Sequence, residues 1–398
     1  MIPSSIQLAN LVGGLSLAVD LAESKTLLHA RDVAYLSLRL AEKVNLPAGE
    51  RDALYYASLL HDIAITSRGI VCPICEAARD YDFEGLIPVL FKADTTLHFV
   101  LESWDGSGPR GLMGDNIPMA ARLLALAVEI DSGGGERADF WKWRQRVLET
   151  LKTYNGNRLD PLLARAMEEL LRDRHFSLEL FDPNYDLKIQ PFRPSDHIST
   201  GSETLDIIGN AFAIFIDTKT PYTADHSRQV AEVALLMARS LGMGEAARRS
   251  IYLAALLHDI GKICIPNAIL EKAGDLTDEE YSMVKNHPYY SALILNRIPE
   301  FETIGLWVSA HHERIDGSGY YLGMRGEEMP LEARLIAVAD VYSALAADRP
   351  YRRGMDRKRI VEVMHGMAKG GHLDKKLVDL VIDLVGSSPG YLFNRAAV

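Results

Sequence analysis

The sequence has few cysteines and no long apolar run. Three cysteines in 398 residues are too few for a disulfide scaffold, so a reducing compartment is expected. No apolar run approaches the ~18 residues of a membrane-spanning helix. The first residues, MIPSSIQLANLVGG, lack the basic start of a signal peptide. We therefore expect a cytoplasmic protein without a membrane span.

Positive charge is also in short supply. The chain has 43 Lys and Arg residues against 54 Asp and Glu residues, a formal net charge of −11. This balance disfavours a broad surface for a nucleic-acid polymer. With 48% hydrophobic and 24% charged residues, the chain can bury a core and is not expected to be disordered. Its length is enough for two domains.

The second half of the chain repeats the first. Residues 29–63 and 226–260 align without a gap, and 14 of the 35 aligned positions are identical. The match resumes in "WDGSG" and "IDGSG", and again in the stretches that begin at Ile117 and Met329. A Pro- and Ser-bearing segment separates the copies. We expect a domain at 1–184, a linker at 185–202 and a second domain at 203–398.

Helical patterns occupy both halves. "VAEVALLMARSLG" has apolar residues at helical spacing and ends at Gly242, which is typical of a C-cap. Thr277 with Glu280 three residues later predicts an N-terminal capping box. No stretch alternates as a strand would. The expected fold is all-α, with two HD-type helical bundles in tandem.

Apolar helices of the second half run into charged residues. "YLAALL" leads directly to His258 and Asp259, and "RLIAVA" leads to Asp340. A buried carboxylate costs several kcal/mol unless it is paired or binds a metal. The candidate ligands are His226, His258, Asp259, His287, His311, His312 and Asp340.

These seven side chains are too many for one ion. They are better suited to two adjacent ions bridged by the two oxygens of Asp259. Imidazole and carboxylate ligands without thiolate suit Fe, Mn or Zn in a hydrolytic site. A single histidine on a helix is more often a core or surface residue than a ligand, but here seven candidate residues occur together as a set.

The motifs that carry these residues resemble the HD-GYP family. They are "PYTADHS", "HDIGKICIPNAIL", "NHP", "HHERIDGSGYY" and "ARLIAVADVYSALAADRPYR", and the resemblance covers roughly residues 200–390. The family consists of bacterial metal-dependent phosphodiesterases that hydrolyse cyclic di-GMP. The resemblance implies that the seven candidates are metal ligands. It also implies that Lys262 lies beside the attacked phosphate, where it acts together with Asp259 in catalysis.

The resemblance favours two divalent metals, Fe or Mn first and then Zn, Ni or Mg. Some family members bind a third metal through a Glu where this chain has Tyr222. A two-metal site lowers the pKa of bound water, so that hydroxide is available near neutral pH. The family motif ends in Gly-Tyr-Pro, whereas this chain has Gly319-Tyr320-Tyr321. The departure changes no proposed ligand, but it puts in doubt any partner contact assigned to that turn.

Substrate contacts are expected next to these motifs, at Arg314, Tyr320, Arg349, Tyr351 and Arg352. Guanidinium groups suit phosphate oxygens and guanine edges, and a tyrosine ring can stack on a base. The alternative is that these arginines only solvate helix ends. The glycines of "DGSG" likewise allow a close approach to a ligand or form an ordinary turn. The first repeat keeps this turn without the histidines, which indicates that the primary role of the turn is structural.

The first repeat has lost most of the site. His29, His61 and Asp62 remain, which could hold one ion weakly but not a dinuclear centre. Ile65 replaces Lys262, Val128 replaces Asp340, and the histidine pair is replaced by Val100 and Leu101, which we expect in the core. The repeat is then either a non-catalytic domain that senses a signal or gates the second repeat, or a structural domain that serves only packing and dimerisation.

The cysteines give little more. Cys72 and Cys75, in "CPIC", could bind zinc or form a dithiol, but a single pair with an internal proline is also compatible with a turn. Cys264 is expected to be a small apolar filler.

The expected function is hydrolysis of cyclic di-GMP to linear pGpG, and onward to GMP, in bacterial signalling. One alternative is the same reaction on another cyclic dinucleotide such as 3′3′-cyclic GMP-AMP. A second is a non-catalytic cyclic-dinucleotide receptor. The partners to consider are the substrate, a second copy of the chain and a GGDEF-type cyclase.

Overall fold

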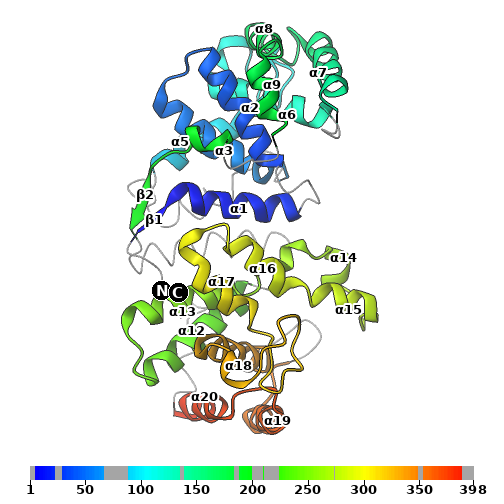
Figure 1. The fold of residues 1–398 in the computed structure, drawn as a ribbon. Helices are drawn as coiled ribbons and strands as arrows, with labels where there is room; N and C mark the ends of the chain where they lie inside the picture. The colour runs from blue at the N-terminus through cyan, green and yellow to red at the C-terminus, as the bar shows by residue number, and fades with distance from the viewer. Residues whose placement is uncertain are drawn as a thin grey trace. The chain divides into compact units, whose positions relative to one another are not determined.

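The fold is all-α, as predicted. The computed structural model describes residues 5–22, 29–66, 88–134, 139–182, 188–199, 209, 224–272, 274–347 and 353–387. The chain divides into two compact units, Gln7–Ile198 and Ser199–Val398 with Met1–Ile6. Both consist of helices (Figure 1). Among the described residues, no helix is long and apolar enough to cross a membrane. The domain boundaries expected from the sequence stay a prediction.

The first unit contains eight described α-helices. They are α1 (Leu8–Ala22), α2 (His29–Lys43), α3 (Ala48–Thr66), α5 (Pro88–His98), α6 (Met119–Gly134), α7 (Phe140–Tyr154), α8 (Pro161–Leu170) and α9 (Arg174–Leu180), with short 3₁₀ helices η2 (Gly114–Asn116) and η3 (Gln190–Phe192). Two three-residue strands, β1 (Ser5–Gln7) and β2 (His197–Ser199), pair with each other.

The second unit follows a similar order. Its helices are α12 (Ala224–Ser240), α13 (Glu245–Leu257), η4 (Ile260–Cys264), α14 (Asn267–Leu270), α15 (Asp278–Val284), α16 (His287–Leu295), η5 (Pro299–Phe301), α17 (Glu302–Ser309), η6 (Gly326–Glu328), α18 (Leu331–Ala346), α19 (Arg357–Lys369) and α20 (Lys375–Ser387).

The predicted helix ends are confirmed at two places in this unit. The Thr277 hydroxyl accepts the N–H of Glu280 at 3.2 Å, and the Glu280 carboxylate accepts the N–H of Thr277 at 2.8 Å. This is the capping box at the start of α15. Gly242 follows α12 with φ of +68°, the left-handed conformation that glycine adopts most readily at a helix end.

Helix α12 lies at the centre of the second unit. It packs against α13, α18 and α20, while α16 packs against α17 and η4 (Figure 1). The facing residues Val230, Ala234 and Met237 are fully buried. Because α17 packs against α13, α16 and α18, the ends of α13 and α17, the start of α16 and the middle of α18 come close together.

Corresponding helices of the first unit pack in the corresponding way. Helix α2 packs against α3 and α6, as α12 packs against α13 and α18. Arg122 of α6 donates to Asp160 at 2.7 Å, and Arg334 of α18 donates to Asp374 at 2.7 Å. Hydrogen bonds as well as sequence are therefore repeated.

The "DGSG" turn has the same internal support in both units. Buried Glu313 accepts the N–H groups of Tyr321 and Leu322 at 3.1 and 3.0 Å. Glu102 accepts those of Arg110 and Leu112 at 2.8 and 3.0 Å. The last glycine of each turn lies directly on this glutamate. A Cβ at Gly319 would lie 2.5 Å from Glu313 Cα, and the equivalent distance in the first unit is 2.6 Å.

The substitution Gly319→Ala is therefore expected to lower the free energy of unfolding by about 1–3 kcal/mol, the usual cost of overpacking. Gly366→Ala in α19 is the matched control, because a Cβ there meets nothing within 4 Å and alanine favours the helix by roughly 1 kcal/mol. Urea unfolding measures both. Wild-type stability of Gly319→Ala would show that the turn relaxes without cost.

Candidate metal centre

All seven candidate ligands lie close together. His226 is in α12, His258 and Asp259 directly follow α13, and His287 is the first residue of α16. His311 and His312 follow α17, and Asp340 is in α18. His258 and Asp259 were expected within a helix; instead α13 ends at Leu257, and the chain turns into η4. The turn places the Asp259 carboxylate between two groups of histidines.

The first group contains His226, His258 and Asp340. Nε2 of His226 is 3.1 Å from Oδ1 of Asp340, and Nε2 of His258 is 3.8 Å from the same oxygen. Nε2 of His258 is also 3.3 Å from Oδ2 of Asp259. The ligand atoms of His226, His258 and Asp259 all lie within 4.8 Å of one another.

The second group contains His287, His311 and His312. Their ligand nitrogens lie within 4.8 Å of one another, and Nε2 of His287 is 3.3 Å from Nε2 of His311. Nε2 of His287 is 3.2 Å from Oδ1 of Asp259. Asp259 therefore presents one oxygen to each group, which is the arrangement that a carboxylate bridging two ions requires.

These spacings fit metal ions. Bonds of roughly 2.1 Å place neighbouring ligand atoms about 3.0 Å apart in octahedral and about 3.4 Å apart in tetrahedral geometry. The observed 3.1–3.3 Å between His226 and Asp340, His258 and Asp259, and His287 and Asp259 lies in this interval. In addition, Nε2 of fully buried His258 forms no hydrogen bond among the described residues. A buried polar atom without a hydrogen bond is costly unless it binds something.

Backbone carbonyls fix three of the imidazoles. Nδ1 of His258 is 2.7 Å from the carbonyl of Ala255, and Nδ1 of His287 is 2.7 Å from that of Val284. His311 repeats this contact with Val308 at 2.5 Å. A carbonyl only accepts, so each Nδ1 carries the proton and each Nε2 has its lone pair directed into the centre. Such contacts are the usual outer support of metal-binding histidines.

The charge states also suit a metal centre. Burial, together with the neighbouring imidazoles, lowers the pKa of His311 well below its usual value, and burial lowers the pKa of His312 to about 3. Burial alone would raise the pKa of Asp259, but His258 and Lys262 hold it well below the usual range. Neutral imidazoles and charged carboxylates are the forms that bind metals. His258 differs: burial acts to lower its pKa, but Asp259 and Asp340 raise it above the usual value, so a metal bound there would have to displace a proton.

Lys262 lies at the edge of the centre. Its Nζ is 2.5 Å from Oδ2 of Asp259, and its side chain is 24% exposed. The preceding Gly261 allows this turn, because a Cβ there would lie 2.1 Å from the carbonyl of His287. Ser291 accepts the N–H of Gly261 at 2.8 Å and donates to the carbonyl of His258 at 3.0 Å. The turn is thereby held against α16.

Two of the predicted substrate contacts are described. The ring of Tyr320 lies 4.7 Å from that of His312 between centroids, so it borders the centre. Arg314 is half-buried and donates to the Ser318 hydroxyl at 3.3 Å. The others, Arg349, Tyr351 and Arg352, lie outside the described residues, as do Tyr222 and the Cys72–Cys75 pair. Cys264 is half-buried in η4.

The structure adds side chains that sequence patterns did not select. Tyr281 of α15 is hydrogen-bonded to Tyr320, and this bond, after burial, raises the pKa of Tyr320. Glu313 supports the turn that carries Tyr320, and Ser291 joins α16 to the residues after α13. Of these three residues, only Glu313 had a signal in the sequence, because it directly follows the two candidate ligands His311 and His312.

One expectation about the first repeat is wrong in part. Val100 is buried as predicted, but Leu101 is 41% exposed. Its counterpart His312 is itself only half-buried, so the second position of the pair lies at the rim in both units. The first position alone became core.

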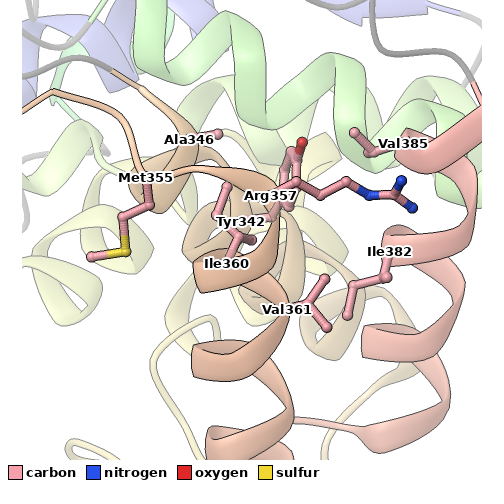
Figure 2. A pocket seen from close by; sticks show the side chains of 8 residues that line it. All are labelled: Tyr342, Ala346, Met355, Arg357, Ile360, Val361, Ile382 and Val385. Atoms are coloured by element: carbon pink, nitrogen blue, oxygen red, sulfur yellow. The ribbon is translucent and has the colours of Figure 1, made fainter.

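A cavity of about 230 Å³ lies elsewhere in the second unit (Figure 2). It is bordered by α18, α19, α20 and Met355, and Tyr342, Ile360 and Ile382 project into it. Tyr342 follows Asp340 by two residues, about 200° around the helix. The cavity is therefore on the opposite side of α18 from the candidate ligand.

Comparison with known proteins places this site in a family. A sequence profile for the HD domain matches residues 211–377. The 3′3′-cGAMP-specific phosphodiesterase 1 of Vibrio cholerae is 32% identical over 390 residues, covering 89% of this chain and 86% of that protein. The chain belongs to the HD-GYP family of HD-domain proteins.

Other HD-GYP relatives are matched over different lengths. The 3′3′-cGAMP-specific phosphodiesterase 3 of the same organism is 35% identical over 270 residues, 67% of this chain but only 58% of that protein. A cyclic di-GMP phosphodiesterase of Pseudomonas aeruginosa is 39% identical over 176 residues, 44% of this chain and 42% of that protein. The crystal structure of a cyclic GMP-AMP specific phosphodiesterase of V. cholerae has a TM-score of 0.71 at 25% identity, covering 96% of this chain and 98% of that one.

Substitution of Asp259, which faces both groups of ligands, and of Asp340, which belongs to one group, should affect metal content differently. Asp259→Ala is expected to remove two metal ions per chain, because both groups of histidines share this carboxylate. Asp340→Asn should weaken only one ion, since the ion pairs of its carboxylate among the described residues are with His226 and His258. Metal analysis by mass spectrometry after dialysis measures both.

The matched control is Asp379→Asn on α20, whose exposed carboxylate pairs with His365 and Lys375 and should leave metal content unchanged. Circular dichroism establishes that each variant is folded. A folded Asp259→Ala protein that retains both ions would contradict the bridging role.

Proposed function

We propose that the chain is a metal-dependent cyclic dinucleotide phosphodiesterase, with 3′3′-cyclic GMP-AMP as its preferred substrate. The observation that carries this proposal is the Asp259 carboxylate between two histidine groups, with one oxygen toward each. Two-metal sites of this kind are typical of phosphodiester hydrolysis. Family membership agrees with the same reaction class.

Bound divalent ions, Fe or Mn first and then Zn, Ni or Mg, would supply charge for the phosphate oxygens and a water of lowered pKa. The seven ligand side chains hold them. Lys262 would neutralise charge that develops on the phosphate or protonate the departing 3′ oxygen. Tyr320, which borders the centre, and Arg314, in the same turn, are our candidates for contacts with base and phosphate. Arg349, Tyr351 and Arg352 remain proposed on sequence alone.

The preferred substrate differs from the one first expected. Three relatives named for 3′3′-cGAMP align over 251, 270 and 390 residues, whereas relatives named for cyclic di-GMP, one of them only as probable, align over 176, 182 and 235. The longer agreement supports 3′3′-cyclic GMP-AMP. Cyclic di-GMP, hydrolysed to pGpG and onward to GMP, is the second candidate, because two relatives named for it are 37–39% identical over their shorter matches. A non-catalytic receptor would have no need of the complete ligand set.

The first unit is proposed to be a second, degenerate HD-type bundle, with domains at 1–184 and 203–398 joined by 185–202. The repeated hydrogen bonds of Arg122 and Arg334 support this, as do those of Glu102 and Glu313. Gating of the second unit and dimerisation are its two candidate roles. A GGDEF-type cyclase is a candidate partner, although Tyr321 replaces the proline of the family turn.

A substrate panel tests the reaction. The metal-loaded full chain is expected to convert 3′3′-cyclic GMP-AMP to the linear dinucleotide faster than cyclic di-GMP, with 2′3′-cyclic GMP-AMP as the control linkage. Chromatography of the products gives the rates. Faster turnover of cyclic di-GMP would reverse the substrate order. Two bound metals with no turnover of any substrate would favour the receptor.

Lys262→Met is expected to lower turnover by roughly 10²–10³-fold, the typical effect of removing one charge-stabilising donor. Both metals should remain bound, since Lys262 is not a ligand, and Lys262→Arg should recover part of the rate. Lys272→Met is the matched control, because that lysine pairs with Glu280 away from the centre. Full activity of Lys262→Met would remove the lysine from the mechanism.

A further inference from the structure

The first unit contains a buried cluster of its own. It is formed by His29 at the start of α2 and by His61 and Asp62 in α3, which are 8%, 0% and 3% exposed. Their ligand atoms all lie within 4.8 Å of one another. Nε2 of His29 is 3.1 Å from Nε2 of His61 and 3.2 Å from Oδ2 of Asp62. Nε2 of His61 is 3.5 Å from Oδ1 of Asp62.

The two distances from His29, 3.1 and 3.2 Å, lie within the interval between neighbouring ligands on one ion, about 3.0–3.4 Å for bonds of roughly 2.1 Å, and the third, 3.5 Å, is slightly longer. Nδ1 of His61 is 2.8 Å from the carbonyl of Ser58, so it donates there and directs the lone pair of Nε2 inward. The same arrangement holds His258 on Ala255 in the second unit. The geometry of a metal-binding imidazole is thus retained in a repeat that has lost most of the other ligands.

A fourth residue, absent from the aligned ligand positions, supports His29. Oδ2 of Asp131 in α6 is 2.5 Å from Nδ1 of His29, and its side chain is 13% exposed. This carboxylate faces the nitrogen of His29 that points away from His61 and Asp62. A carboxylate on the outer nitrogen fixes the tautomer of a ligand histidine and raises its basicity.

We propose that His29, His61 and Asp62 bind a single divalent metal ion and that Asp131 positions His29 for it. Two imidazoles and one carboxylate suit Fe²⁺, Mn²⁺ or Zn²⁺ with remaining positions open to water. The ion joins α2 to α3, and through Asp131 it also ties in α6. Its role is to stabilise the packing of the first unit.

One ion, not two, fits this cluster. Val100 and Leu101 stand where the second unit has His311 and His312. Half-buried His98 lies 3.2 Å from Arg110 and is not among the clustered ligand atoms. Ile65 occupies the position of Lys262, so the catalytic charge is missing and this ion is not expected to hydrolyse a phosphodiester.

The test counts metals in the full chain. Wild type loaded with Mn²⁺ is expected to hold three ions, and Asp259→Ala, which loses the two of the second unit, is expected to hold one. Adding Asp62→Asn to Asp259→Ala should remove the last ion. In the same background, Asp131→Asn should raise the dissociation constant for Mn²⁺ about 10–100-fold. Glu129→Gln, a carboxylate on the same helix paired with Arg158, should not.

Metal content is read by mass spectrometry, the dissociation constant by electron paramagnetic resonance of Mn²⁺, and folding by circular dichroism. A second measurement avoids variants altogether: crystals of the full chain should show an anomalous peak within bonding distance of His29 Nε2 and His61 Nε2. Mn²⁺ should also raise the melting temperature of Asp259→Ala, because ligands that bind only the folded state stabilise it.

A metal-free Asp259→Ala protein with no anomalous peak at His29 would overturn the proposal. In that case His29 is a protonated histidine held between Asp131 and Asp62. The inference is independent of the proposed hydrolysis, since this ion is counted without any substrate and in a variant without the catalytic centre.

Discussion

The Asp259 carboxylate sets the requirement that the rest of the second unit satisfies. It is 2% exposed, and a charge at that depth is stable only when cations or donors surround it. His258 and Lys262 hold its pKa down, and His287 faces its other oxygen. His258 and Lys262 both face Oδ2, whereas His287 faces Oδ1, so cationic or donor groups reach the carboxylate from both sides. The arrangement of α13, α16, α17 and α18 can be understood as the means of bringing those neighbours to one carboxylate.

Most of those neighbours lie at helix ends. His258 and Asp259 follow α13, His287 begins α16 and His311 follows α17. An imidazole at a helix C-terminus can donate Nδ1 to a carbonyl that lacks an intrahelical partner, as His258 and His311 do. The same hydrogen bond therefore satisfies the backbone and orients the ligand. Gly261 then allows the chain to turn within reach of α16, where a side chain would collide with the backbone.

Sequence patterns could select the residues that gather at the candidate metal centre, because acids and histidines that follow apolar runs are conspicuous. They could also predict the all-α fold and the Thr277 capping box, which depend on local periodicity. They could not predict that Tyr281 contacts Tyr320, since that bond joins two distant exposed stretches. The burial of Val100 beside exposed Leu101 was also out of reach, because adjacent residues on a turn can differ completely in exposure without any change in hydrophobicity.

Asp131 illustrates a different limit. The residue aligned with Asp340 is Val128, so an alignment records the carboxylate as lost. Asp131 lies three residues later, nearly one turn along the same face of the helix. Asp340 faces Nε2 of His226, whereas Asp131 faces Nδ1 of His29. A shift of one turn thus changes which imidazole nitrogen the acid meets. In the second unit the acid is a candidate ligand, and in the first, as we propose, it orients one. A repeat that lacks a carboxylate at the aligned position can therefore still have one in contact with the corresponding histidine.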